Sequence, residues 1–453
     1  MNTHSADTVR LVWSSKGHTT DSSDVKLINV ERVVPRAIAD VNGMGFFDGP
    51  TDRPAEISNR VIQGDNLPIM QALLDEGYAG CINVIYIDPP YFSDVDYWSN
   101  VQVGSGENQK LVQRKAFQDT WEKGIDSYLD MLYPRLKLMK KLLADDGTIF
   151  VHLDWHVSHY VKVIMDELFS PGKLINEIVW CYGGGSGAKR HFHRKHDTIF
   201  WYSKGDNYTF NPQYRPYTHG TLERGLTRVK GDRYKLNKKG ALMQDWWSDI
   251  NKILSPTAGE NLKFPTQKPA ALLQRIIGAA SNPGDWVADF FGGTGTTASV
   301  CANMGRRWIV CDNSALALLT TQYRLIHGNV PFIVQQIPLT NLADPENRLE
   351  LLTPVVEKYD RETVLVRVGI KYYSPGEISL PEADFSSYIE YWAVDLDYQG
   401  EFTSDYQIVR KNHRYKGSLD LSIVVRLAAR DKYCMAVKVY DVFANHSIKI
   451  IEF

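Results

Sequence analysis

This chain is organised around Cys81-Ile82-Asn83-Val84-Ile85-Tyr86-Ile87-Asp88-Pro89-Pro90-Tyr91, an apolar run that ends in an Asp-Pro-Pro-Tyr tetrapeptide. Residues 81–87 are mostly apolar or β-branched and are too few for a globular helix, so they predict a buried strand. The two prolines end the strand pairing and make the following loop rigid. Open α/β sheets bind their ligands at the carboxyl ends of strands, which makes Asp88 and Tyr91 candidates for chemistry. The alternative is an ordinary strand-end turn.

Length and composition indicate a globular protein with more than one domain. The chain has 453 residues, of which 43% are hydrophobic and 23% are charged, and these fractions are typical of soluble proteins. No apolar run is long enough to span a membrane and the amino terminus lacks an apolar signal core, so we expect a cytoplasmic protein without a membrane partner. The five cysteines are never spaced as CxxC, which argues against a disulfide framework and against a cysteine zinc site.

Predicted strands and helices alternate through most of the chain. The apolar patterns predict strands at 60–63, 81–87, 148–153, 175–180, 198–202, 286–291 and 308–311, with amphipathic helices between most of them. This alternation predicts an α/β fold in which helices cover both faces of a mostly parallel, Rossmann-like sheet. Residues 92–120 are predicted to form a long polar loop, whose length favours a functional role.

The same patterns divide the chain into three parts. Residues 1–55 are polar and rich in turns, and we interpret them as an N-terminal extension. Residues 56–335 form the α/β domain, in which a basic insert occupies about 205–260. Residues 336–453 contain short, often alternating strands and predict a separate β-rich domain.

A glycine-rich turn follows the predicted strand at 286–291. Its sequence is Asp289-Phe290-Phe291-Gly292-Gly293-Thr294-Gly295, and it lies between a strand and a helix, where nucleotide-type cofactors bind. The spacing is GGTG, so the full GxGxxG dinucleotide fingerprint is absent. Asp312 ends the next strand and is placed to bind ribose hydroxyls.

Positive charge is concentrated in one segment of a nearly neutral chain. Residues 189–239 contain thirteen Lys or Arg against four Asp or Glu, a net charge of +9. Tyrosines are interleaved with these cations, which favours contact with DNA phosphates and bases over the alternative of a solvated surface. The residues that we expect to contact DNA are Arg190, Arg194, Lys195, Arg215, Arg224, Arg228, Lys230 and Arg233. His191, His193 and His196 lie nearby, but no carboxylate or cysteine joins them at metal-ligand spacing, so no metal site is expected.

Three motifs in this order resemble a known family. Asp88-Pro89-Pro90-Tyr91 is followed by Thr266-Gln267-Lys268-Pro269 and then by the glycine turn at 289–295. The set resembles the beta class of amino-methylating DNA methyltransferases, in which the catalytic half precedes the cofactor half in a circularly permuted order. The modification subunits of type III restriction systems are similar over about residues 57–331. Two departures are Phe290, where the family usually has proline, and a middle segment that is short for a type III specificity domain.

The resemblance implies a cofactor and a set of site residues. The cofactor is S-adenosylmethionine, and the catalytic residues are Asp88, Pro89, Pro90 and Tyr91. Asp88 and the Pro89 carbonyl would accept the two N–H groups of the target amine, while Tyr91 would stack on a flipped base. The glycine turn with Asp289 would hold the methionine end of the cofactor, Asp312 its ribose, and Asp65 with Asn66 its adenine. The expected cofactor-binding residues are Asp65, Asn66, Lys268, Asp289, Phe291, Gly293, Gly295, Thr296 and Asp312.

The function that the resemblance implies is site-specific methylation of the N6 amino group of adenine in double-stranded DNA. The methyl group would pass directly to a flipped base, within a restriction-modification or phage-defence system. The resemblance further implies a homodimer and a restriction or helicase subunit as partner. Two alternatives stay open: an N4-cytosine methyltransferase, although such enzymes more often carry Ser in place of Asp88, and a DNA-recognition subunit whose catalytic half is vestigial.

Overall fold

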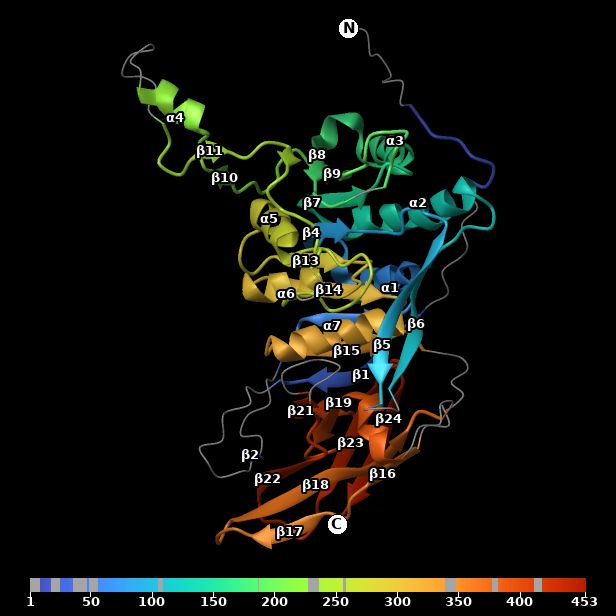
Figure 1. Cartoon of the computed structure of the whole chain (residues 1–453), viewed down its shortest axis with the longest axis vertical. Helices are drawn as coiled ribbons and strands as arrows, with labels where there is room; N and C mark the ends of the chain where they lie inside the picture. The colour runs from blue at the N-terminus through green and yellow to red at the C-terminus, as the bar shows by residue number, and fades with distance from the viewer. Residues whose placement is uncertain are drawn as a thin grey trace.

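The computed structural model describes residues 9–17, 25–35, 47–48, 56–104, 109–185, 187–226, 236–255, 258–338, 348–376, 382–410 and 418–453. Within these residues the main sheet has eleven strands (Figure 1). Their order across the sheet is β12 (Trp246–Trp247), β8 (Leu174–Cys181), β9 (His196–Ser203), β7 (Leu143–Leu153), β4 (Ile82–Ile87), β13 (Trp286–Asp289), β14 (Arg307–Asp312), β3 (Arg60–Gln63), β15 (Phe332–Gln336), β1 (Ile28–Val33) and β20 (Thr403–Ser404).

The centre of this sheet is parallel, as predicted. Strands β7, β4, β13, β14, β3 and β15 pair in parallel, whereas β9 and β1 run antiparallel to their neighbours β7 and β15. β4 and β13 are adjacent, but the chain continues from β4 towards β7 on one side and from β13 towards β14 on the other. This divergence opens a crevice at the carboxyl ends of β4 and β13, which is where such sheets bind ligands.

Helices cover both faces of the main sheet, so the predicted Rossmann-like α/β class is confirmed. Apolar side chains of α1, α2 and α3 share one buried core with the sheet, and those of α5, α6 and α7 share the other. The helices are α1 (Asn66–Leu73), η1 (Leu74–Tyr78), α2 (Ile125–Leu142), α3 (Ser158–Phe169), η3 (Pro171–Lys173), α5 (Ala270–Ala280), α6 (Thr296–Asn303) and α7 (Ala315–His327). Helix α2 is an example of the predicted amphipathic pattern. Its apolar residues Leu129, Leu132, Leu136 and Met139 recur at helical spacing and are all buried.

Residues 92–120 were expected to form a polar loop, and this prediction is wrong. The segment contains a long antiparallel hairpin of β5 (Val95–Val103) and β6 (Lys110–Asp119). The hairpin reaches from the edge of the α/β domain to the C-terminal strands (Figure 1). Val101 and Val103 are buried in the same apolar core as those strands. This packing partner lies about 300 residues away in the chain, so the local sequence pattern could not reveal it.

The C-terminal part is β-rich, as predicted. One sheet contains β16 (Arg348–Leu351), β18 (Thr363–Ser374), β22 (Ser422–Ala428) and β2 (Phe47–Asp48), with β17 (Val355–Lys358) paired to β18. The other contains β21 (Tyr406–Val409), β19 (Ile389–Asp395), β23 (Cys434–Asp441) and β24 (His446–Glu452), and η5 (Glu382–Tyr388) precedes β19. The two sheets bury a common apolar core.

Strand β1 joins this β-rich part to the main sheet. Strand β1 comes from the segment expected as an N-terminal extension, and it pairs with β20 from the C-terminal part. The carboxylate of Glu31 in β1 is fully buried, and it accepts hydrogen bonds from Lys438 Nζ at 2.9 Å and from the Tyr440 hydroxyl. Because a buried charge is stable only when it is paired, these bonds tie β1 to β23.

The basic insert projects from the molecule at the end farthest from the C-terminal strands (Figure 1). It contains β10 (Tyr214–Arg215), β11 (Ala241–Leu242) and α4 (His219–Leu226). Among the described residues, no helix is long and apolar enough to cross a membrane.

Candidate active site

Asp88 lies at the carboxyl end of β4, where its carboxylate is already engaged. One oxygen accepts a hydrogen bond from the Tyr91 hydroxyl, and the other is paired with the amine of Lys268. Burial, together with the nearby charge of Asp88, raises the pKa of Tyr91 well above its usual range. Tyr91 therefore keeps its proton and serves as a donor to Asp88.

Lys268 was expected to bind the cofactor, and in the structure its amine also contacts the catalytic loop. It precedes α5, and its amine lies against Asp88, with the side chains of the pair 10% and 17% exposed. Its carbonyl accepts a hydrogen bond from Thr296 Oγ1 at 3.2 Å. Lys268 thus joins the Asp88 loop to the first residue of α6, and so connects the two motif-bearing halves of the sheet.

Asp119 holds the loop that follows the Asp-Pro-Pro-Tyr motif. Its carboxylate accepts hydrogen bonds from the backbone N–H of Tyr91 at 3.2 Å, of Phe92 at 2.9 Å and of Ser93 at 2.9 Å. It also accepts hydrogen bonds from the Ser93 hydroxyl at 2.6 Å and from the Trp121 indole N–H at 2.8 Å. Asp119 is 1% exposed. Sequence reasoning missed this residue, because an Asp at the end of an unrecognised strand carries no local signal.

The glycine turn uses backbone conformations that other residues rarely adopt. Gly293 has φ of +52° and Gly295 has φ of +67°, and such positive values are costly for residues with a Cβ. The Asp289 carboxylate closes the turn by accepting hydrogen bonds from Phe291 N–H at 3.0 Å and from Thr297 Oγ1 at 2.5 Å. The Asp312 carboxylate accepts a bond from Gly293 N–H at 2.8 Å. Asp289 and Asp312 therefore shape the turn as well as face the crevice.

Gly295→Ala is expected to lower the free energy of unfolding by about 2–4 kcal/mol. A Cβ at this position would lie 2.5 Å from Thr321 Cγ2, and the positive φ adds backbone strain. Chemical denaturation of the two proteins measures the difference. Gly284→Ala is the matched control, because Gly284 also has a positive φ of +90° but open space around it. Equal losses in the two variants would show that the contact with Thr321 is unimportant.

Burial changes the pKa values of the two carboxyl groups at the turn. Burial raises the pKa of Asp289 to about 7, the hydrogen bonds from Thr297 and Phe291 oppose this rise, and the charges of Asp88 and Asp312 add to it. Burial also raises the pKa of Asp312, against the backbone hydrogen bonds from Ser314, Gly293 and Asn313. A cationic ligand in this crevice would favour the ionised forms of both groups.

Asp65 and Asn66 lie at the start of α1 and are held by one arginine. The Asp65 side chain caps the helix by accepting from Leu67 N–H at 2.9 Å, and it pairs with Arg135 Nη2 at 2.6 Å. The Asn66 amide donates to the Phe290 carbonyl at 2.6 Å and accepts from Arg135 Nε. Asn66 thus ties α1 to the glycine turn across 224 residues of sequence.

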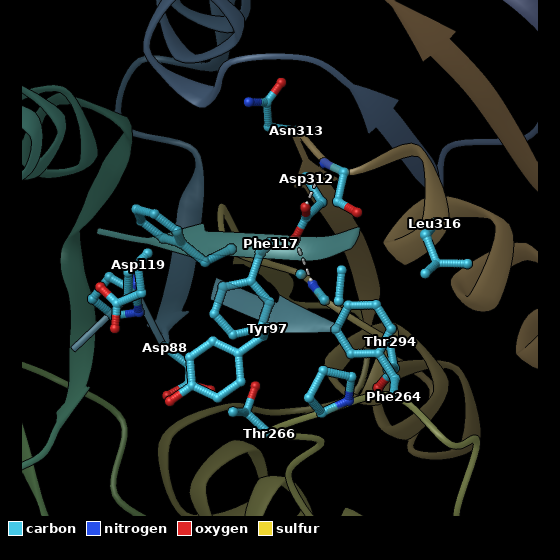
Figure 2. Close-up of a pocket in the computed structure, with 18 of the residues that line it drawn as sticks. Asp88, Tyr97, Phe117, Asp119, Phe264, Thr266, Thr294, Asp312, Asn313 and Leu316 are labelled. Carbon is cyan, nitrogen blue, oxygen red and sulfur yellow. Dashed lines mark hydrogen bonds between the residues drawn. The ribbon is translucent and has the colours of Figure 1, made fainter. Parts of the chain in front are cut away.

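These residues surround one cavity of about 810 Å³ (Figure 2). This volume lies within the usual range for small-molecule sites. All the expected catalytic and cofactor-binding residues line it except Gly295, the last residue of the turn: Asp65, Asn66, Asp88, Pro89, Pro90, Tyr91, Lys268, Asp289, Phe291, Gly293, Thr296 and Asp312. The structure thus brings together three motifs that are spread over about 200 residues of sequence.

A buried polar network lies behind the Asp88 loop. The ring of His152 lies between the Tyr86 hydroxyl at 2.9 Å and the Asp197 carboxylate at 3.2 Å, and Tyr182 donates to Asp197 at 2.7 Å. Burial alone would raise the pKa of Asp197, but the hydrogen bond and charge of His152, with Lys252 and Lys268, hold it below its usual range. The His152 ring also makes a tilted contact with the Tyr91 ring, with 6.1 Å between their centroids, so it supports that ring.

Those of the expected DNA-contacting residues whose side chains the structure describes lie outside the cavity. Arg190 is exposed, the Arg194 guanidinium lies 3.8 Å from the Trp155 ring centroid, and Lys195 Nζ donates to the Gly185 carbonyl at 3.0 Å. Arg215 donates to Gln244 at 2.9 Å. Arg224 belongs to α4, although its side chain is not described, and Arg228, Lys230 and Arg233 lie outside the described residues. The loop after β8 contains Arg190 and Arg194, and it lies at the same sheet edge as Asp88, since β8 and β7 both run antiparallel to β9.

The fold and this cavity define an α/β enzyme that joins an acidic, proline-rich loop to a nucleotide-type glycine turn. Residues 82–320 match the N6_N4_Mtase family, described as DNA methylase, over more than half of the chain. The chain belongs to this family and is a DNA methyltransferase.

Two characterised relatives agree with this assignment. The type II methyltransferase M.EcaI of Enterobacter cloacae is 26% identical over an alignment of 336 residues, and the match covers 61% of this chain and 71% of that protein. The type II methyltransferase M1.MboII of Moraxella bovis is 32% identical over an alignment of 255 residues, and the match covers 53% of this chain and 88% of that protein.

Solved structures show more distant likenesses. The M1.HpyAVI–SAM complex is 19% identical, with a TM-score of 0.40, and the match covers 59% of this chain and 98% of that one. The cytosine-N4-specific PvuII DNA methyltransferase is 17% identical, with a TM-score of 0.40, and the match covers 59% of this chain and 86% of that one.

Proposed function

We propose that this enzyme transfers the methyl group of S-adenosylmethionine to the N6 amino group of adenine in double-stranded DNA. The observation that carries the proposal is the single cavity shared by the Asp88 loop and the glycine turn. A methyl donor and a flipped base bound there would lie side by side, as direct transfer requires.

The donor groups of the glycine turn fit this cofactor. S-adenosylmethionine has a sulfonium and an ammonium group, and it supplies a methyl group that is already activated for attack. Asp289 and Asp312 offer carboxylates to its cationic part and its ribose, while Asp65 and Asn66 line the same cavity and are assigned to its adenine. Arg135 donates hydrogen bonds to both Asp65 and Asn66, and so fixes the orientation of these two side chains.

The residues of the Asp88 loop supply the acceptor side of the reaction. The amino group of adenine is a weak nucleophile, because its lone pair is delocalised into the ring. Asp88 accepts one N–H of this group and the Pro89 carbonyl accepts the other, which stabilises the positive charge that develops on nitrogen. The carboxylate has about four lone-pair positions, so it can accept this bond while Tyr91 and Lys268 remain in place.

Asp88 also supports adenine over cytosine, since related N4-cytosine enzymes more often have Ser at that position. The likeness to M.EcaI and M1.MboII, which are named type II methyltransferases, supports a role in restriction-modification or phage defence. The resemblance to modification subunits supports a homodimer and a restriction or helicase partner subunit.

Radiolabelled methyl transfer to duplexes of varied sequence tests the proposal. Nucleoside analysis of the labelled DNA is expected to yield N6-methyladenine. Recovery of N4-methylcytosine would replace adenine by cytosine as the target, and the absence of transfer to any duplex would support a recognition subunit without activity.

Asp289 is expected to make cofactor binding depend on pH. A carboxyl group with a pKa of about 7 is protonated below that pH, whereas the cationic cofactor favours the ionised form. Binding should therefore release a proton, and affinity should fall about tenfold for each pH unit below about 7. Titration calorimetry from pH 5.5 to 8.5 in buffers of different ionisation enthalpy measures both effects. Asp289→Asn should remove the pH dependence, and an unchanged slope in that variant would assign it to another group.

The same carboxyl group affects the stability of the cofactor-free protein. Between about pH 4 and 7 the folded chain holds a proton on Asp289 that the unfolded chain has released. Its contribution to stability is therefore fully present below about pH 4 and is lost as the pH rises through about 7.

Binding to DNA is expected to be strongly salt-dependent, because phosphate contacts release counterions. Arg190→Ala and Arg194→Ala should each weaken duplex binding and reduce the slope of log affinity against log salt by about one. Fluorescence anisotropy with a labelled duplex measures this slope. Arg348→Ala is the control, since this exposed arginine belongs to a C-terminal strand and pairs with Glu350. If Arg190→Ala and Arg194→Ala both leave the slope unchanged, neither arginine contacts DNA phosphates.

A further inference from the structure

The β5–β6 hairpin places aromatic rings in the cavity. Tyr97 and Phe117 are directly paired across the two strands, and their rings are stacked with centroids 4.5 Å apart and planes 16° apart. Phe264 continues the row, with its centroid 6.4 Å from that of Phe117. All three rings line the cavity and are partly exposed in it, and Figure 2 shows them between Asp88 and Thr294. We call this set the aromatic wall.

The aromatic wall is attached to the Asp88 side of the cavity. The Tyr97 hydroxyl lies 3.2 Å from Ser93 Oγ, and Ser93 is bonded to Asp119, the residue that also holds Tyr91. Phe264 belongs to the segment that leads to Lys268, whose amine is paired with Asp88. The aromatic wall is therefore connected to the Asp88 loop, where the acceptor base is expected, and not to the glycine turn around Asp289.

The C-terminal β-rich part holds the hairpin in position. Arg114 of β6 is 7% exposed, and its guanidinium donates to the Val442 carbonyl and, at 3.1 Å, to Ser99 Oγ. Ser99 in turn donates to the Lys263 carbonyl at 3.0 Å, next to Phe264. Phe443, adjacent to Val442, itself lines the cavity. One buried arginine thus connects the C-terminal part, the hairpin and the loop that carries Phe264.

We propose that the aromatic wall is a binding surface for the flipped target base, and that the C-terminal part positions this wall through Arg114. This inference rests on the proposed function and deepens it by assigning the base a second contact besides Tyr91. Every nucleobase has a flat π face, so stacking on an aromatic ring stabilises it without selecting its sequence. Selection between adenine and cytosine is then left to the groups that bind the amino edge, Asp88 and the Pro89 carbonyl.

Phe117→Ala tests the wall. Loss of one stacking contact is expected to lower kcat/KM for duplex DNA by about 10- to 100-fold, with the dissociation constant for S-adenosylmethionine unchanged within about twofold. Phe117→Tyr should keep most of the activity. Trp98→Ala is the matched control, because this aromatic residue is on the same hairpin and is 50% exposed; it should leave kcat/KM unchanged.

Three results would overturn the assignment of the wall. Full activity of Phe117→Ala would show that the ring contributes nothing, and equal losses in Phe117→Ala and Trp98→Ala would indicate a general effect on the hairpin. A parallel loss of cofactor affinity would assign the wall to the cofactor site. Failure of the proposed function is distinct from all three, since the unmodified enzyme would then transfer no methyl group to adenine.

Arg114→Met tests the positioning role of the C-terminal part. Methionine keeps much of the side-chain length but cannot donate to Val442 or Ser99, so the variant should repeat the loss in kcat/KM for DNA seen in Phe117→Ala with cofactor affinity retained. Arg114→Lys should restore part of the activity, because it keeps a charged donor. Combining Arg114→Met with Phe117→Ala should add little further loss. Additive losses, or a loss of cofactor affinity together with DNA activity, would show that Arg114 acts by general stability instead.

Discussion

Asp88→Ala is expected to lower kcat for methyl transfer by about 10²- to 10³-fold, the effect of removing one group that stabilises charge in a transition state. The substitution removes the acceptor that we assign to the target amino group. It also deprives the Lys268 amine of its partner, which leaves a cation beside a nitrogen that becomes positive during transfer. Both changes raise the barrier to reaction more than they weaken the binding of either substrate.

Single-turnover kinetics with preformed enzyme–cofactor complex measure this loss free of product release. Asp88→Asn separates the two causes, since its amide oxygen still accepts one N–H while its charge is gone. Asp94→Ala is the matched control, because it changes an exposed carboxylate a few residues farther along the same loop. Asp88→Ala with kcat within threefold of the unmodified enzyme would contradict the role of Asp88 and favour a different acceptor.

Asp119→Ala is expected to reduce kcat by about 100-fold and to lower the free energy of unfolding by about 3 kcal/mol or more. Hydrogen bonds to a charged acceptor stabilise by about 1.5–3 kcal/mol each, and this carboxylate accepts bonds from Tyr91, Phe92, Ser93 and Trp121. Its loss would free the backbone of the loop that carries Tyr91. A displacement of that ring by about 1 Å is enough for a loss of this size.

Denaturation curves and steady-state kinetics at a temperature where both proteins are folded separate the two effects. Asp119→Asn keeps one acceptor oxygen and should have intermediate kcat. Asp96→Ala is the control, because Asp96 is on the same hairpin and is paired with Lys115 near the surface. A stability loss in Asp119→Ala without any change in kcat would limit Asp119 to a structural role.

The C-terminal part has a more direct relation to the site than its position in the chain indicates. Its core includes Val101 and Val103 of the hairpin, and Arg114 joins the Val442 carbonyl to the wall of the cavity. Truncation of this part would therefore be expected to disturb the cavity as well as any surface for a partner. The same contacts explain why residues 92–120 contain a stable hairpin: an isolated pair of strands is only marginally stable in water, and this pair buries Val101 and Val103 against the C-terminal strands.

The amino-acid sequence by itself determined the parts of this protein whose signals are local. The apolar run before Asp88 predicted a buried strand, the glycines at 292–295 predicted a turn before a helix, and the apolar patterns between the strands predicted amphipathic helices such as α2. These predictions depend on interactions between residues that are near one another in the chain, where periodicity and backbone sterics act.

Only the tertiary structure decided which distant groups meet. It brought Lys268 to Asp88, Asp119 to the loop of Tyr91, and Asn66 to the carbonyl of Phe290. It also converted a segment expected to be a polar loop into a hairpin that lines the cavity. Such contacts result from long-range pairing and burial, which no window of neighbouring residues encodes. The Asp-Pro-Pro-Tyr loop was therefore visible in the sequence, whereas the set of residues that holds it became visible only in the fold.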